Sequence, residues 1–235
     1  VYLRTHKDST SISLKPKDFK PSKKIIKEVC SVGVPSAVQN LLNVTGQTIL
    51  NNMAAAFGPV AVSSIGITHK VIMIPMYICG VGNGVTPLIG YNYSSGNRKR
   101  MKDIIIYTAK IAIGLAVVLS IAVFLFSGKI TYAFMKDSEI VALGGTLLKY
   151  ASPTCLFLAI DFLSVGIFQA CGLGLYAFIF AILRKVVLEI PLLYVWNKIY
   201  PLYGLAFAQP TAELVLAIVA IIIVKKIMDG KLPKK

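Results

Sequence analysis

The chain has 235 residues, of which 56% are hydrophobic, and its mean hydropathy is +0.72. Soluble domains contain about 45–50% apolar residues, so the composition excludes an ordinary soluble domain. The net charge of +15 is concentrated at the flanks of the hydrophobic runs, in residues 1–27, 98–102 and 225–235. Basic flanks mark the cytoplasmic side of membrane spans, whereas a nucleic-acid surface needs them within a soluble fold. We therefore expect an integral membrane protein that contacts lipid and binds no nucleic acid.

Apolar runs long enough to cross a bilayer, about 18–20 residues each, recur along the chain. They predict an all-α integral membrane fold with six transmembrane helices, at residues 25–56, 62–91, 103–126, 138–170, 176–196 and 203–228. Ser127-Gly128 is predicted to close the third of these helices. In domain terms, residues 1–24 are predicted to be a polar, basic linker, residues 25–228 a six-helix transmembrane lobe, and residues 229–235 a basic tail.

The distribution of lysine and arginine predicts how the spans are oriented. If residues 1–24 lie inside the cell, the basic residues 98–102 and the lysine tail also lie inside, and the outer loops keep only Lys129, Lys136 and Lys198. This bias predicts a multi-pass protein of the plasma membrane with both ends of the chain cytoplasmic. No signal peptide follows Val1, and we expect the chain to start at a cut within a longer protein.

The first predicted helix carries amide side chains at a strict spacing of four residues. These are Gln39, Asn43, Gln47 and Asn51. Residues four apart lie along one face of a helix, and a polar face is costly against lipid. We expect the amides to line a cavity, the substrate or ion pathway, although hydrogen bonding between packed helices is the alternative.

Asp161 lies well inside the fourth predicted helix. An ionised carboxylate at the centre of a span costs at least about 2.5–3.5 kcal/mol, so it requires a partner, water, a bound cation or a proton. Water, a cation or a proton would suit a coupling site for H⁺ or Na⁺, and Asp161 is the candidate sodium ligand. The alternative is a structural pair with a basic side chain elsewhere in the fold.

Other charges lie within the last two predicted helices. Arg184, Lys185 and Glu189 form a cluster in which Lys185 and Glu189, four residues apart, are placed to neutralise each other. Pro191 is expected to weaken this helix shortly afterwards. Glu213 is the only acid of the sixth helix, and its partner cannot be named from the sequence.

Catalytic motifs are missing from the sequence. It contains no HExxH, GxSxG or Walker A pattern. We therefore expect a protein that is not an enzyme and needs no cofactor beyond a coupling ion, and an intramembrane enzyme using Asp161 is the minor alternative.

The order of several short motifs resembles the C-terminal half of a multidrug and toxic compound extrusion (MATE) transporter, over nearly the whole chain. The matching segments are Lys27-Glu28, Gly33–Ser36, Gly82–Tyr93 with Arg98–Lys102, Phe168–Gly172, Leu183–Lys185 and Ile190–Leu192. The resemblance implies one six-helix lobe of a twelve-helix secondary antiporter that exports organic cations or drugs in exchange for H⁺ or Na⁺. It also implies a partner lobe, the N-terminal half of the same transporter.

In some members of that family, an acid in the seventh helix and an aspartate in the tenth bind the coupling ion. The resemblance places the tenth-helix aspartate at Asp161, whereas the seventh-helix acid falls on Asn43. This departure leaves open whether the coupling ion binds in this lobe or in the other. Two alternative functions remain, a lipid-linked sugar flippase of the same superfamily and a non-transporting membrane scaffold.

Overall fold

The computed structural model describes residues 22–79 and 84–230. In this part the helices are α2 (Lys23–Ala55), α3 (Pro59–Cys79), α5 (Thr86–Ser94), α6 (Arg98–Phe134), α7 (Ser138–Ala151), α8 (Thr154–Ala170), α9 (Gly174–Ile182), η2 (Leu183–Glu189), α10 (Ile190–Ile199) and α11 (Tyr203–Met228). Most of the predicted linker and most of the predicted tail lie outside the described residues. The described residues confirm the predicted all-α fold.

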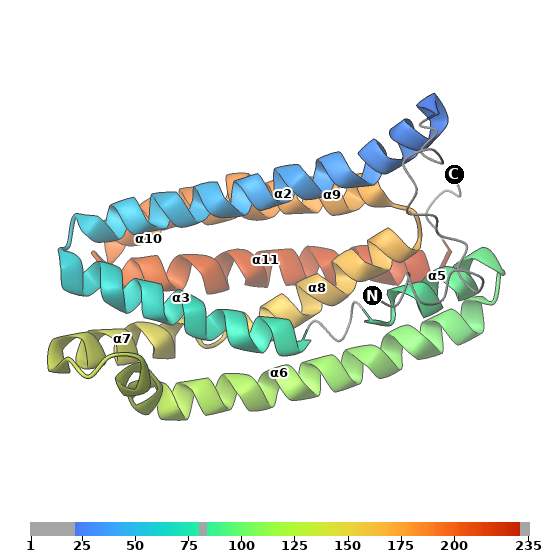
Figure 1. Cartoon of the computed structure of the whole chain (residues 1–235). Helices are drawn as coiled ribbons and strands as arrows, with labels where there is room; N and C mark the ends of the chain where they lie inside the picture. Colours follow the sequence, from blue (N-terminus) through green and yellow to red (C-terminus); the bar gives the residue numbers. More distant parts are fainter. Residues whose placement is uncertain (1–21, 80–83, 231–235) are drawn as a thin grey trace, which may run out of the picture.

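The long helices run along a common axis, with α2 at one edge of the view, α6 at the other, and α3, α8 and α11 between them (Figure 1). Helix α11 packs against α7, α8, η2 and α10, so it forms the centre of the bundle. The start of α2 and the end of α11 lie at the same end (Figure 1). This agrees with an even number of passes, while the cytoplasmic assignment of that end remains a prediction.

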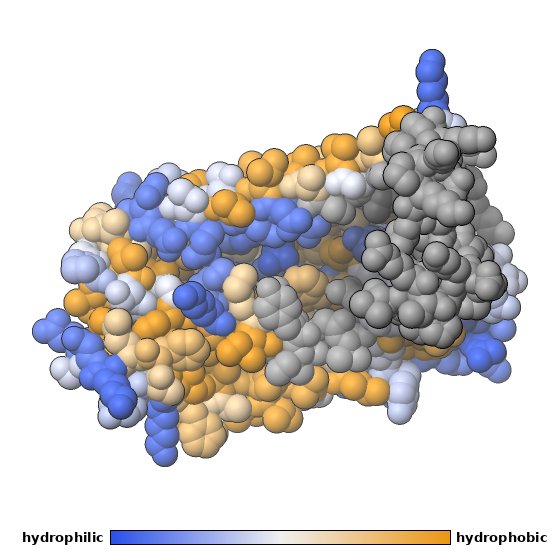
Figure 2. All heavy atoms as spheres, viewed as in Figure 1, coloured by the Kyte–Doolittle hydropathy of each residue, from blue (hydrophilic) through white to orange (hydrophobic). Residues whose placement is uncertain are grey.

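Length and composition single out α6 and α11 as helices able to span a bilayer. The pair α7 and α8 provides a third span if the two are counted as one bent element. Helix α2 has 33 residues and is long enough, but its amides interrupt the apolar run. Figure 2 shows hydrophilic side chains gathered in a strip over α2, bordered by hydrophobic surface.

The predicted end of the third helix at Ser127-Gly128 is wrong, because α6 continues without a break to Phe134. A Cβ atom on Gly145 of α7 would lie 3.2 Å from the Cα of Gly128. The small residues therefore permit close approach of two helices and do not end one.

The predicted fourth helix is broken by Pro153 into α7 and α8, which meet at an angle of 45°. Pro153 has no N–H group to continue the helical hydrogen bonds. The hydroxyl of Ser120 on α6 donates to the carbonyl of Ser152 at 2.9 Å. This bond satisfies a backbone acceptor at the break, as the interior of a membrane protein requires.

The N-terminal end of α7 is capped by Asp137, whose carboxylate accepts from the N–H groups of Glu139 and Ile140 at 2.9 and 3.1 Å. We expect Asp137→Ala to lower the free energy of unfolding by about 1 kcal/mol, measured by denaturant titration in detergent micelles. Asp103→Ala, at an exposed position of α6, is the control and should change it by less than about 0.5 kcal/mol. Equal effects of the two substitutions would contradict a role for the cap.

Candidate functional site

The four amides on α2 that the sequence singles out are all half-buried. Gln47 donates through Nε2 to the Oδ1 atom of Asn51 at 3.4 Å. Gln39 and Gln47 line two separate pockets, and Asn43 lies between them along the helix. The amides thus share one face, as predicted, but they do not meet in a single chamber.

The Gln39 pocket holds the buried aspartate. Asp161, on α8, is 1% exposed and lines a pocket with about 290 Å³ of empty volume. Gln39, Phe162, Phe180 and Arg184 lie around the same pocket. Neither carboxylate oxygen of Asp161 has a hydrogen-bond partner among the described residues, so the structure gives this buried acid no donor.

Glu213, which lacks an identifiable partner in the sequence, lies beside Arg184. The Nε atom of Arg184 lies 2.8 Å from Oε1 of Glu213, so the two side chains form an ion pair. The angle at the N–H group does not meet that of a hydrogen bond. Arg184 therefore pairs across to α11 and not within its own cluster. Its guanidinium carbon also lies 5.8 Å from the ring centre of Phe162.

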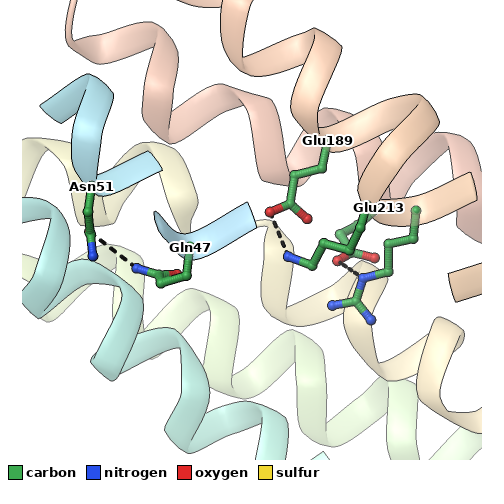
Figure 3. A network of polar contacts seen from close by, with 6 residues as sticks. Gln47, Asn51, Glu189 and Glu213 are labelled. Carbon is green, nitrogen blue, oxygen red and sulfur yellow. Dashed lines mark hydrogen bonds and ion pairs between the residues drawn. The ribbon is translucent and has the colours of Figure 1, made fainter. Parts of the chain in front are cut away.

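The predicted pair of Lys185 and Glu189 is confirmed, with Nζ donating to Oε1 at 2.6 Å. Figure 3 shows this pair and the Arg184–Glu213 pair side by side. A Cβ atom on Gly46 of α2 would lie 3.4 Å from Cδ of Lys185 and 3.6 Å from Oε1 of Glu189. Gly46, which has no side chain, therefore leaves room on α2 for the Lys185–Glu189 pair. Its position among the amides in the sequence does not indicate this role.

The segment that carries these charges, η2, is a π-helix between α9 and α10. The N–H of Ile190 donates to the carbonyl of Lys185, five residues earlier, and Pro191 follows without an N–H. The wider turn relieves the clash of a proline ring with the preceding turn. Adjacent residues of a helix do not share a face, so Arg184 contacts α11 while Lys185 lies against α2.

A second pocket, with about 510 Å³ of empty volume, lies near the other pair. Its polar lining consists of Gln47, Thr68, His69, Glu189 and Gln209. The Oε2 atom of Glu189 has no hydrogen-bond partner in the described part of the chain. Gln209 on α11 was not singled out by the sequence, because one amide without a periodic partner gives no signal.

Among the described residues, no three His, Cys, Asp or Glu side chains come together as a metal cluster. The candidate sodium ligand, Asp161, is joined by one further acid, Glu213, with which it interacts electrostatically.

The chain resembles known proteins in sequence and in fold. Residues 35–195 match the family model MatE. The multidrug export protein MepA of Staphylococcus aureus (strain bovine RF122 / ET3-1) is 34% identical over 97% of this chain, and MepA of Staphylococcus saprophyticus is also 34% identical over 97%. The chain covers 50% of each of these relatives, so it spans about half of their length.

Solved structures share the fold at lower identity. One is the outward-facing conformation of a multidrug resistance MATE family transporter of the MOP superfamily, with a TM-score of 0.86, 21% identity, and coverage of 97% of this chain and 52% of that one. A MOP superfamily transporter from Pyrococcus furiosus, described by the reversed polarity of its binding pocket, matches with the same values. Since the family model covers more than half of the chain and relatives above 30% identity cover nearly all of it, the chain belongs to the MatE family of multidrug and toxic compound extrusion transporters.

Proposed function

We propose that the chain is the C-terminal lobe of a secondary active multidrug antiporter of the plasma membrane, which exports organic cations or drugs in exchange for H⁺ or Na⁺. The observation that carries the proposal is Asp161, a buried carboxylate without a hydrogen-bond donor that borders a pocket. An intramembrane acid of this kind marks an ion pathway by default.

The polar face of α2 supports a cavity on the same side of the lobe. Gln39 reaches the pocket of Asp161, whereas Asn40, Thr48 and Asn52 are exposed. Exposed amides are costly against lipid, so this face is expected to border water between two lobes. Alternating access by the rocking of two lobes then requires the N-terminal half of the same transporter.

The relatives named above as multidrug export proteins support the choice of substrate class. The flippase alternative predicts a larger, more cationic cavity, with Arg184 and Lys185 facing its lumen. Arg184 does border the Asp161 pocket, but both basic side chains are paired with glutamates. This neutralisation favours export of organic cations. The scaffold alternative predicts that Asn43 and Asp161 tolerate apolar replacement without loss of activity.

The test is drug efflux from a sensitive host that expresses the two-lobed transporter with and without Asp161→Asn. We expect efflux to fall at least about tenfold, because loss of about 1.4 kcal/mol in ion affinity already gives that factor. Glu139→Gln, which neutralises an exposed acid at the start of α7, should leave efflux unchanged. Unchanged efflux with Asp161→Asn at matched membrane expression would remove Asp161 from the cycle, and no efflux by the unmodified protein would favour the flippase.

A further inference from the structure

The bundle buries more acids than bases among the described residues. Three carboxylates, those of Asp161, Glu189 and Glu213, are buried. The two basic side chains paired with them are Lys185, which is buried, and Arg184, which is 12% exposed. Lys185 and Glu189 neutralise each other, with Nζ 2.6 Å from Oε1. One guanidinium, that of Arg184, thus remains for the two carboxylates of Asp161 and Glu213, and the three groups together have one negative charge in excess.

The positions of these groups show that Arg184 is shared. It lies against Glu213 at 2.8 Å and borders the same pocket as Asp161. It interacts electrostatically with Glu213, Glu189 and Asp161, of which Glu189 already has Lys185 as its partner. A guanidinium has five N–H donors in a planar fork and can serve two carboxylates. Glu213 of α11, which is 0% exposed, therefore pairs with the guanidinium of Arg184, which would otherwise pair with Asp161.

The two carboxyl groups also lie within reach of each other. Asp161 on α8 and Glu213 on α11 belong to packed helices and interact electrostatically, yet all four of their oxygens lack a donor. Two carboxylates so placed repel each other unless a proton or a cation lies between them. One monovalent cation would remove both the repulsion and the excess charge.

We propose that Asp161 and Glu213 together form the binding site for one monovalent cation, H⁺ or Na⁺, with Arg184 as their fixed counter-ion. The proposal rests on the function proposed above and adds Glu213 and Arg184 to it. With the cation bound, Arg184 pairs with Glu213. When the cation leaves, the guanidinium serves both carboxylates, and Gln39 and the pocket beside Asp161 provide the opening for exchange.

The proposal makes a charge-counting prediction for the purified two-lobed transporter in detergent. Na⁺ binding is measured by isothermal titration calorimetry with choline replacing Na⁺ at constant ionic strength, and proton uptake by potentiometric titration. We expect one cation, Na⁺ or H⁺, per molecule at this site. Glu213→Gln should weaken binding of that cation at least about tenfold, although Asp161 is intact, because Arg184 then neutralises Asp161.

The double variant Arg184→Gln/Glu213→Gln distinguishes a charge role from a structural one. It removes one base and one acid, restores the single excess charge at Asp161, and should regain cation binding to within about threefold of the unmodified protein. Glu139→Gln is the matched control and should bind as the unmodified protein does. If Glu213→Gln alone fails to fold, the double variant, which has the same excess of one negative charge as the unmodified protein, decides the question by itself.

The outcomes separate this inference from the proposed function. Unchanged cation binding in Glu213→Gln, with loss in Asp161→Asn, would overturn the shared site and leave Asp161 as the sole ligand. A folded double variant that stays without cation binding would also overturn it. Unchanged binding in Asp161→Asn would overturn the coupling site as a whole.

Discussion

Replacing Glu189 alone by alanine is expected to lower the free energy of unfolding by about 3–5 kcal/mol. The substitution leaves the ammonium group of Lys185 without its partner at a position that is 8% exposed. Lys185 cannot swing away easily, because its stem lies against Gly46 of α2. The measurement is denaturant-induced unfolding of the two-lobed transporter in mixed micelles.

The control for that prediction is the double replacement Lys185→Met/Glu189→Leu, which removes both charges and keeps the volume. We expect it to change the free energy of unfolding by less than about 1.5 kcal/mol, because a buried ion pair and a packed apolar pair are often close in stability. A loss as large as that of Glu189→Ala would show that the pair is needed for more than charge neutralisation.

The contrast between the two ion pairs shows what the sequence could reveal about the site. Lys185 and Glu189 are four residues apart, and residues at this spacing are neighbours on the surface of a helix. Their pairing is therefore predictable from the sequence. Arg184 and Glu213 belong to separate helices and meet only because η2 packs on α11. No local pattern carries that information, so the sequence alone does not identify the partner of Glu213.

Arg184 and Lys185 have different partners because adjacent residues of a helix do not share a face. Arg184 contacts Glu213 of α11, and Lys185 lies against Gly46 of α2. The sequence places the two basic residues on different faces but does not say which helix lies opposite each face. Pro191 indicated a local disturbance, but its form depends on how the surrounding helices pack.

Glycine marks a helix end at some positions of this chain and a close packing contact at others. Gly58 has a φ of +96° after the end of α2, a conformation that favours glycine, and the end predicted at residue 56 agrees with the observed end at Ala55. At Ser127-Gly128 the same residue types serve close packing against Gly145. The two uses of glycine look alike in a sequence and differ only in what lies opposite.

The amide face of α2 was predictable as a face but not as a cavity. The period of four places Gln39 and Gln47 on the same side, which the structure bears out. Their assignment to different pockets depends on where α3, α9 and η2 pack against α2. Such crossings follow from side-chain packing across the whole bundle, and a periodic pattern in one helix does not contain them.

Gly204→Ala is expected to lower the free energy of unfolding by about 3 kcal/mol, the upper end of the usual cost of overpacking. Gly204 follows the turn between α10 and α11, where Leu202 has a φ of +68° and the N–H of Tyr203 donates to the carbonyl of Pro201 at 2.9 Å. A Cβ atom on Gly204 would overlap the backbone carbonyl of Trp196. Backbone cannot rotate aside as a side chain does, so the turn itself would have to open.

The matched control is Gly114→Ala in the middle of α6, where an added Cβ would meet nothing within 4 Å. There the same substitution should raise the free energy of unfolding by about 0.5–1 kcal/mol, because alanine favours the helix over glycine. Opposite signs at the two positions, measured by denaturant titration in micelles, would show that the contact with Trp196 causes the loss. A small effect at Gly204 would mean that α10 and α11 adjust their spacing without cost, and the turn would then not fix how α11 carries Glu213 into the bundle.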